Sequence, residues 1–480
     1  MKKNTLLFIL TLCLFFSKSY GQRYQSTNGT SLSDDYWAVV EDTTIGAYVT
    51  IGNSTNVDQF SRIWISSYNN NGVLTTSAIA TNGRRMIARD ISIAPKDSST
   101  GKSTYYVTGW TQATIGTAVI NQMFVGRINL NGNFLWYKEN PSNTATTGQN
   151  KEGVSIVTAP NGDAVALGIA SVPLTGNIPA GNRIILSRFN LSGTPIWSNV
   201  YNQTGNWMPR SIANGATTPN CAVSPTTMPG SFVITGEVII PVSGGNSKPT
   251  TFACGYNGGG TECWRGLYPA TLSLTTTADA GYDVLLNPNS GNYNIVGVVQ
   301  FGSVRASASS TPYLVELSTS GVLVKSTVYI KNLNFTPMGL YPRTCTMGKA
   351  NLTVPGRLIF AGPDFSTNKV FVGSVTSIGS SGTFVNYAGL ATSNSVAQPF
   401  YLNDGQSEGI LTTKKAALSG YLISTNALPT GAFGGGDGHL LKTDLALQTP
   451  TNCKNTPLDN TTIQSNNSTF TTPSVIQQTL

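Results

Sequence analysis

The fold is decided by two similar stretches, Met123-Phe-Val-Gly-Arg-Ile-Asn-Leu-Asn-Gly-Asn-Phe-Leu-Trp136 and Ile184-Ile-Leu-Ser-Arg-Phe-Asn-Leu-Ser-Gly-Thr-Pro-Ile-Trp197. Each contains an apolar strand, a tight Asn-Gly or Ser-Gly turn, and a second strand that ends in tryptophan. Tight hairpin turns need residues that tolerate positive φ, and glycine and asparagine do so at little cost. Both stretches therefore predict β-hairpins of the same design.

Looser copies of this hairpin recur along the chain, for example at residues 63–75, 252–264 and 313–325. Each copy follows another predicted hairpin, such as the one around Pro160-Asn161-Gly162. Two successive hairpins make a unit of four strands that spans roughly 45–65 residues. Seven such units are predicted, at residues 34–81, 86–140, 152–202, 208–269, 279–330, 337–389 and 396–448.

Tandem units of four strands predict an all-β fold, the β-propeller, because a single unit is too small to bury its faces without neighbours. We expect seven four-stranded antiparallel blades, with six or eight as alternatives. The seventh unit lacks a clear fourth strand of its own. Residues 22–30 resemble the outer strand that precedes the fourth unit, so an N-terminal strand is expected to close the last blade. The propeller is expected to occupy residues 22–449.

Small residues recur late in the second strand of the units and predict close packing between neighbouring blades. They are Gly109, Gly168, Gly236, Gly297 and Ala361.

The composition excludes several function classes. The chain has 480 residues, of which only 29 are Lys or Arg and 21 are Asp or Glu, whereas coiled coils and helical bundles need strongly charged outer faces. Its one histidine, His439, excludes sites built from several histidines, so no metal and no cofactor are expected. The chain has no dense basic block, so nucleic acid is not an expected partner.

The N-terminus has the layout of a secretory signal peptide, which we place at residues 1–21. Its apolar run, residues 6–16, is too short to span a bilayer, so no transmembrane segment is expected. The protein is expected to be secreted or displayed at the cell surface, with the periplasm as an alternative location. Residues 450–480 are rich in Ser, Thr and Asn and are predicted to form a flexible tail.

Export permits disulfides. Cys254 and Cys263 flank a turn-like stretch and are the favoured pair, although sequence alone does not fix connectivity. Five cysteines follow the signal peptide, so at least one is left free or pairs with another chain, which suggests self-association.

The strand-Asn-Gly-strand-Trp unit resembles the repeats of secreted β-propellers from Bacteroidota. The spacing of Gly132 and Trp136 is also distantly similar to the docking motif of quinoprotein-like propellers. These resemblances imply a blade and no particular activity. We interpret Trp136, Trp197 and Trp264 as packing wedges between blades.

Candidate binding residues lie where the loops enter the innermost strands, because such loops vary on a rigid ring. Together they predict a mixed-charge rim, in which arginine could hold a carboxylate and aromatic rings could stack on sugars. The candidates are Asp35, Arg85, Glu152, Trp207, Arg210, Asp279 and Glu408.

No catalytic residue type recurs, so we assign no catalytic residue and expect a non-catalytic scaffold for binding or adhesion. Its expected partners are extracellular glycans or surface proteins. The first alternative is a polysaccharide-active enzyme, a glycoside hydrolase or lyase that uses rim carboxylates such as Glu152 and Asp279. The second alternative is a subunit of an extracellular assembly.

Overall fold

The computed structural model contains strands and no helix in the residues that it describes, so the all-β prediction is confirmed. In this part of the chain there is accordingly no helix long and apolar enough to cross a membrane. The predicted signal peptide lies outside the described residues. These residues are 24–28, 34–55, 61–115, 118–139, 150–172, 181–201, 205–216, 228–240, 248–270, 276–301, 310–330, 340–347, 357–364, 369–380, 382–387, 410–412, 421–427, 437–443, 455–457 and 464–465.

The strands follow one another in antiparallel hairpins. Their bounds are β1 (Tyr24–Asn28), β2 (Asp34–Asp42), β3 (Ala47–Thr55), β4 (Ser61–Asn69), β5 (Leu74–Ala80), β6 (Met86–Ala94), β7 (Thr104–Ile115), β8 (Ala118–Asn129), β9 (Phe134–Glu139), β10 (Lys151–Thr158), β11 (Ala164–Val172), β12 (Gly181–Phe189), β13 (Pro195–Tyr201), β14 (Asn206–Asn214), β15 (Ser231–Ile239), β16 (Pro249–Asn257), β17 (Glu262–Leu267), β18 (Thr276–Leu286), β19 (Tyr293–Phe301), β20 (Ser310–Leu317), β21 (Leu323–Ile330), β22 (Thr344–Met347), β23 (Leu358–Asp364), β24 (Lys369–Val375), β25 (Gly382–Tyr387), β26 (Ile410–Thr412), β27 (Tyr421–Ala427), β28 (Asp437–Thr443), β29 (Asn455–Pro457) and β30 (Gln464–Ser465).

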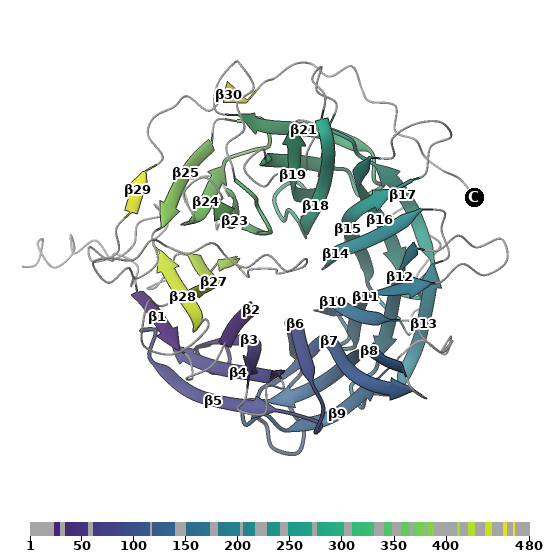
Figure 1. Ribbon diagram of the computed structural model, residues 1–480, viewed down its shortest axis with the longest axis vertical. Helices are drawn as coiled ribbons and strands as arrows, with labels where there is room; N and C mark the ends of the chain where they lie inside the picture. Colours follow the sequence, from purple (N-terminus) through teal and green to yellow (C-terminus); the bar gives the residue numbers. More distant parts are fainter. Residues whose placement is uncertain are drawn as a thin grey trace, which may run out of the picture.

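The sheets are arranged around a common centre as a β-propeller (Figure 1). Six complete blades are each built from four consecutive strands, with the first strand of the blade nearest the centre. In chain order they are β2–β5, β6–β9, β10–β13, β14–β17, β18–β21 and β22–β25. Six such blades stand where the sequence predicts seven, and six was the stated alternative. The difference arises in the last predicted unit, which lacks a fourth strand of its own.

The remaining sheet is assembled from both ends of the chain, in the order β1-β28-β27-β26. Tyr24 of β1 lies opposite Lys442, and Asn28 lies opposite Gly438. An N-terminal strand therefore joins the last strands of the ring, as the sequence predicts. Within the predicted flexible tail, β29 pairs with β25 and β30 pairs with β21, so these two short segments extend the outer edges of the fifth and sixth blades.

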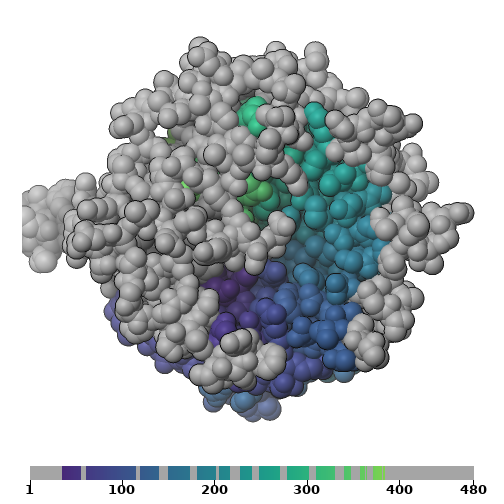
Figure 2. All heavy atoms as spheres, viewed as in Figure 1, coloured from purple at the N-terminus to yellow at the C-terminus, as the bar shows by residue number. Residues whose placement is uncertain are grey.

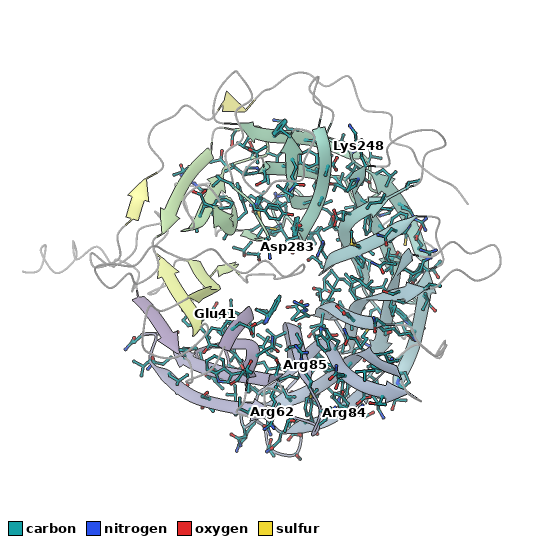
Figure 3. All side chains as sticks on the ribbon, viewed as in Figure 1. Glu41, Arg62, Arg84, Arg85, Lys248 and Asp283 are labelled. Atoms are coloured by element: carbon teal, nitrogen blue, oxygen red, sulfur yellow. The ribbon has the colours of Figure 1, made fainter. Side chains whose placement is uncertain are left out.

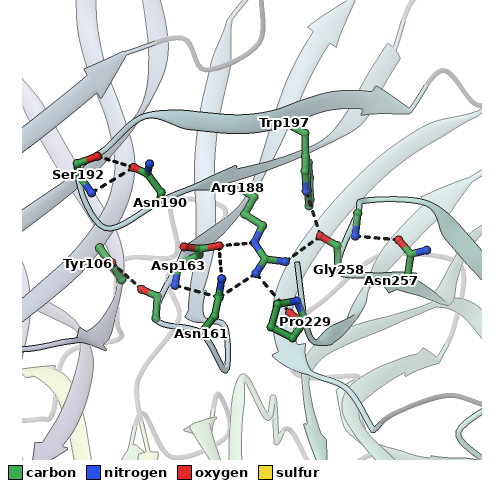
Figure 4. Close-up of polar contacts among 12 residues, drawn as sticks. Tyr106, Asn161, Asp163, Arg188, Asn190, Ser192, Trp197, Pro229, Asn257 and Gly258 are labelled. Atoms are coloured by element: carbon green, nitrogen blue, oxygen red, sulfur yellow. Dashed lines mark hydrogen bonds and ion pairs between the residues drawn. The ribbon is translucent and has the colours of Figure 1, made fainter. Parts of the chain in front are cut away.

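Neighbouring blades are held together by the recurrent tryptophans, which confirms their interpretation as wedges. The indole N–H of Trp136 donates to the carbonyl oxygen of Leu191 in the next blade, at 3.0 Å. Trp197 makes the equivalent bond to Gly258 at 3.1 Å (Figure 4). The Trp136 ring lies so close to the next turn that a Cβ on Gly193 would stand 2.6 Å from it. Each wedge thus requires a glycine in the turn that it supports.

The predicted Cys254–Cys263 bridge is wrong, because Cys254 is a free, buried thiol. In the β16–β17 hairpin Cys254 lies opposite Arg265, and the register shifts between Gly255 and Tyr256. That shift leaves Cys263 as the extra residue of a bulge, so the two cysteines are not cross-strand partners. Burial raises the pKa of the Cys254 thiol well above its usual range.

Candidate functional site

The first strands of five blades share one irregularity. Each pairs with the second strand of its blade in a register that skips a single residue, which is the signature of a β-bulge. Because a skipped residue makes no regular ladder contact, a bulge can re-aim its side chain. The skipped residues, in blade order, are Trp37, Arg89, Val154, Arg210 and Tyr282.

The bulges explain the small residues that recur on the second strands. A Cβ on Gly109 would lie 1.9 Å from the carbonyl oxygen of Ile87, just before the bulge in its own blade. Gly52, Gly236 and Gly297 are crowded in the same way. At these glycines the close approach is therefore between the first two strands of one blade, and the prediction of close packing between blades is wrong there. It holds at Gly168, where an added Cβ would stand 2.5 Å from the sulfur of Met123 in the preceding blade.

The sixth blade extends the series. A Cβ on Gly362 would meet the carbonyl of Tyr341 and the backbone of Pro342. In the second blade, a Cβ on Gly109 would likewise meet the two residues that precede the bulge. By this correspondence Arg343 takes the place of the skipped residue. We call the six side chains at this level of the innermost strands the axial girdle: Trp37, Arg89, Val154, Arg210, Tyr282 and Arg343.

Arg89 lies over an aromatic ring of the preceding blade, with its guanidinium carbon 4.1 Å from the Trp37 ring centroid. Burial lowers the pKa of Arg89, while Glu152 and Asp35 act in the opposite direction. Arg210 and Arg343 lower that pKa further by repulsion. The three arginines therefore lie within electrostatic range of one another.

Arg210 and Tyr282 form the matching contact between the fourth and fifth blades. The guanidinium carbon of Arg210 is 5.3 Å from the Tyr282 ring centroid, and its Nη2 donates to Glu237 at 3.0 Å. Burial acts to lower the pKa of Arg210, but Tyr282 and Glu237 outweigh it, so the pKa is raised and the charge is retained. The Tyr282 hydroxyl shares a hydrogen bond with that of Tyr341, over which Arg343 lies at 5.5 Å.

Two predicted rim carboxylates, Asp35 and Glu152, lie beside this girdle. Asp35 accepts a hydrogen bond from the backbone N–H of Asn53 at 2.7 Å, and burial raises its pKa to about 6. Glu152 accepts from Asn121 at 2.8 Å. Around neutral pH the centre of the ring therefore holds charges of both signs.

The residue after the bulge clips neighbouring blades together. Asp283 accepts hydrogen bonds from Ser211 at 2.6 Å and from the backbone of Cys345 at 2.7 Å, so one carboxylate ties β18 to both β14 and β22. Asp90 ties β6 to β10 by accepting a hydrogen bond from the Ser155 hydroxyl at 2.6 Å. Burial raises the pKa of Asp90 to about 6. Asp283 lies beside the centre of the ring, whereas Arg84 is at its periphery (Figure 3).

The other predicted site residues lie elsewhere. Trp207 is buried and packs against Phe252. Asp279 is buried and accepts backbone hydrogen bonds from Thr251 and Ala270.

Arg85 is exposed, with its guanidinium carbon 5.4 Å from the Trp110 ring centroid. Glu408 lies outside the described residues. Of the predicted candidates, Asp35, Glu152 and Arg210 are brought together at the girdle, and Trp37, Arg89 and Tyr282 were missed.

The described side chains include no group of three or more His, Cys, Asp or Glu placed to hold a metal ion. On the face seen in Figure 2, the surface dips toward the centre where the purple, blue and teal blades meet. The arrangement is suited to holding an anion, because arginines that lie over aromatic rings have little conformational freedom to lose on binding.

No family model and no curated protein matches the sequence. Solved structures with a similar overall shape include a polysaccharide lyase of family PL25, an ulvan lyase bound to -[GlcA(1-4)Rha3S]-, at 9% identity and a TM-score of 0.47, covering 87% of this chain and 96% of that one. The polysaccharide lyase Uly1 is similar at 11% identity and a TM-score of 0.47, covering 88% and 92%. The sialidase of Trypanosoma rangeli, in complex with sialic acid, is similar at 9% identity and a TM-score of 0.37, covering 87% of this chain and 59% of that one. Superpositions this loose carry no inference about the activity of this chain.

Proposed function

We propose that the protein is a non-catalytic binding module for acidic glycans, which it holds at the axial girdle. The observation that carries this proposal is the occurrence of arginine at the same bulge position in three blades, at Arg89, Arg210 and Arg343. Arginine recognises carboxylate and sulfate groups through its planar fork of donors. Three such forks at one level of a ring form a receptor for negative charge.

The aromatic residues of the girdle support this function by orienting the arginines. Trp37 and Tyr282 each lie under a guanidinium of a neighbouring blade, so the arginines are held before a ligand arrives. Preorganisation of this kind reduces the entropy lost on binding.

The protonation state of one residue, Tyr341, favours binding over catalysis. Burial raises the pKa of Tyr341 well above its ordinary value, which disfavours the phenolate that a general base would need. The pKa of Asp35 is close to 6, so the net charge of the girdle becomes more positive as the pH falls. Glycan binding is therefore expected to strengthen between pH 8 and pH 5.

We also propose the setting in which this module works. The sheet β1-β28-β27-β26 serves as a seventh blade that closes the ring around the girdle. The chain acts outside the cytoplasm after removal of residues 1–21, which is supported by the signal-like N-terminus alone.

Calorimetric titration with dextran sulfate, carboxymethyl dextran and unmodified dextran tests the function. We expect both acidic polymers to bind and neutral dextran not to bind. Arg210→Gln should weaken binding about 10- to 100-fold, since hydrogen bonds to charged groups contribute roughly 1.5–3 kcal/mol. Arg84→Gln is the matched control, because Arg84 is exposed and pairs with Glu139 at the periphery. Equal affinity for neutral and acidic polymers, or binding of none, would reject the proposal.

The second candidate is a polysaccharide-active enzyme, favoured by the presence of Asp35, with a pKa near 6, and Glu152 at the same girdle. A carboxyl group with a pKa near the working pH is suited to proton transfer. Release of reducing ends or of unsaturated uronates from acidic polysaccharides, lost in Glu152→Gln, would favour the enzyme over the binding module.

A further inference from the structure

The arginines of the axial girdle are distributed in a regular way. They occur in the second, fourth and sixth blades, and the blades between them carry Trp37, Val154 and Tyr282 at the same level. Because the blades are arranged around a common centre, alternate blades approach that centre from different sides. The three arginines therefore start from strands on different sides of the axis instead of from one wall.

The strands that carry Arg210 and Arg343 are tied to one common strand, β18, and the strand that carries Arg89 is tied to the next blade. Asp283 accepts hydrogen bonds from Ser211 and Cys345, which are one and two residues beyond Arg210 and Arg343. Asp90, which directly follows Arg89, accepts from Ser155 at 2.6 Å and from the backbone of Ile156 at 2.9 Å. These bonds act next to each arginine, through the Ser211 hydroxyl, the Cys345 backbone N–H and Asp90 itself, so the ring constrains where each arginine leaves its strand.

The chemistry of the anion can be inferred from this spacing. A carboxylate is planar, and a single arginine fork satisfies its two oxygens. A sulfate or phosphate monoester instead presents three terminal oxygens spread around the bond to the sugar, and these can accept from three sides at once. The two esters differ in net charge, because a sulfate ester carries one negative charge and a phosphate monoester carries nearly two at neutral pH.

The carboxylates of Glu152 and Glu237 offset part of the positive charge at the girdle. A monoanion therefore suits the site better than a dianion. We propose that Arg89, Arg210 and Arg343 form a tripod for the sulfate ester of a sulfated glycan. This inference rests on the proposed function and narrows its ligand from any acidic glycan to a sulfated one.

A pair of polymers with a common backbone tests the tripod. Dextran sulfate and carboxymethyl dextran of equal length and equal degree of substitution differ only in the anion. We expect the sulfated form to bind at least about 10-fold more tightly, measured by calorimetry. Equal or tighter binding of the carboxymethyl form overturns the tripod but leaves the binding module standing, whereas binding of neither polymer rejects both.

Lysine variants separate the tripod from simple charge attraction. Arg89→Lys, Arg210→Lys and Arg343→Lys keep the charge but lose the planar fork. Each should reduce the preference for the sulfated polymer toward parity, while Arg84→Lys should leave it unchanged. Thermal denaturation of each variant checks folding, and the three separate positions keep the test decisive if one variant does not fold. An unchanged preference in all folded variants would contradict the tripod.

Glucose 6-sulfate and glucose 6-phosphate, used as competitors of dextran sulfate, decide between the two tetrahedral esters. We expect the sulfate to compete at a lower concentration than the phosphate. Stronger competition by the phosphate would overturn the assignment to sulfate.

Discussion

Two arginines of this propeller differ in how many of their N–H donors are bonded within the fold. Arg188, in the third blade, is fully buried and donates to Asp163, Asn161 and the carbonyl oxygens of Gly258 and Pro229, at 2.8–3.3 Å (Figure 4). Arg210, at the axial girdle, has one carboxylate partner, and its Nε has no hydrogen-bond acceptor among the described residues. The first arginine is saturated by the fold, and the second keeps donor capacity for a ligand.

The contrast extends to the regions around these two residues. The outer hairpins of the second, third and fourth blades repeat the same residues, with an asparagine that caps the turn, a glycine with positive φ and a tryptophan wedge. The girdle repeats a backbone feature, the bulge, but its side chains differ. The shared turns and wedges thus mark what holds the ring together, and the girdle side chains, which change from each blade to the next, mark where the blades specialise.

The largest effect on stability is expected from replacing Arg188, whose donor nitrogens are all bonded within the fold. Arg188→Met should lower the free energy of unfolding by about 3–5 kcal/mol, because it leaves the buried Asp163 without its partner. Denaturant unfolding measures this loss. Affinity for dextran sulfate, corrected for the folded fraction, should not change. A loss below 1 kcal/mol, or a specific loss of binding, would erase the distinction between the two arginines.

An intermediate effect is expected at the wedge turns. Gly193 has φ of 81°, and a Cβ there would meet the ring of Trp136. Gly291 has a similar φ of 72°, but nothing lies within 4 Å of its Cβ position. Both alanine variants incur backbone strain of about 1–2 kcal/mol, and Gly193→Ala should lose a further 1–3 kcal/mol, roughly, by overpacking.

The pair isolates the wedge because the strain is common to both variants. The difference between their unfolding midpoints in denaturant measures the wedge alone. Equal midpoints would show that the tryptophans do not set the packing of successive blades.

The smallest effect is a pH dependence at the girdle. Burial raises the folded-state pKa of Asp35 to about 6. The protonated carboxyl group of Asp35 therefore stabilises the folded protein at low pH, and this contribution is lost as the pH rises toward 6. The groups that face Asp35 are Asn53, Trp37 and Arg89. Asp35→Asn should flatten the decline in unfolding free energy between pH 4 and pH 6, by at most about 1.4 kcal/mol per pH unit. A variant with the slope of the parent protein would show that Asp35 is not held in this way.

The outer regions of the blades were predictable because their structure depends on local sequence. The Asn-Gly and Ser-Gly turns, the alternating strands and the wedge role of Trp136 and Trp197 are visible as repeats. The strand that joins β1 to β28 was also predictable, since residues 22–30 resemble an outer strand that the last unit lacks. The count of complete blades was less secure because the later units diverge from the repeat.

The girdle was predicted only in part, since a bulge depends on how two strands align and has no residue signature. Arg210 and Glu152 were named as rim charges, but Arg89 and Tyr282 lie within strands that otherwise resemble ordinary inner strands. The available signal was the glycine on the second strand of each unit, such as Gly109. That glycine marks the place where the first strand approaches just before its bulge. The bulge residue lies two positions after the residue whose carbonyl crowds the glycine, as Arg89 lies two positions after Ile87.

The bulges also bear on how such a ring can be modified. The side chain of a skipped residue has no directly opposite partner on the second strand, so Val154 can be exchanged for another side chain without altering the pairing of β10 with β11. Each blade therefore offers one interchangeable position at a common height. Substitutions at these positions can change the binding specificity at the axis one blade at a time, while the strand pairing of the scaffold is left intact.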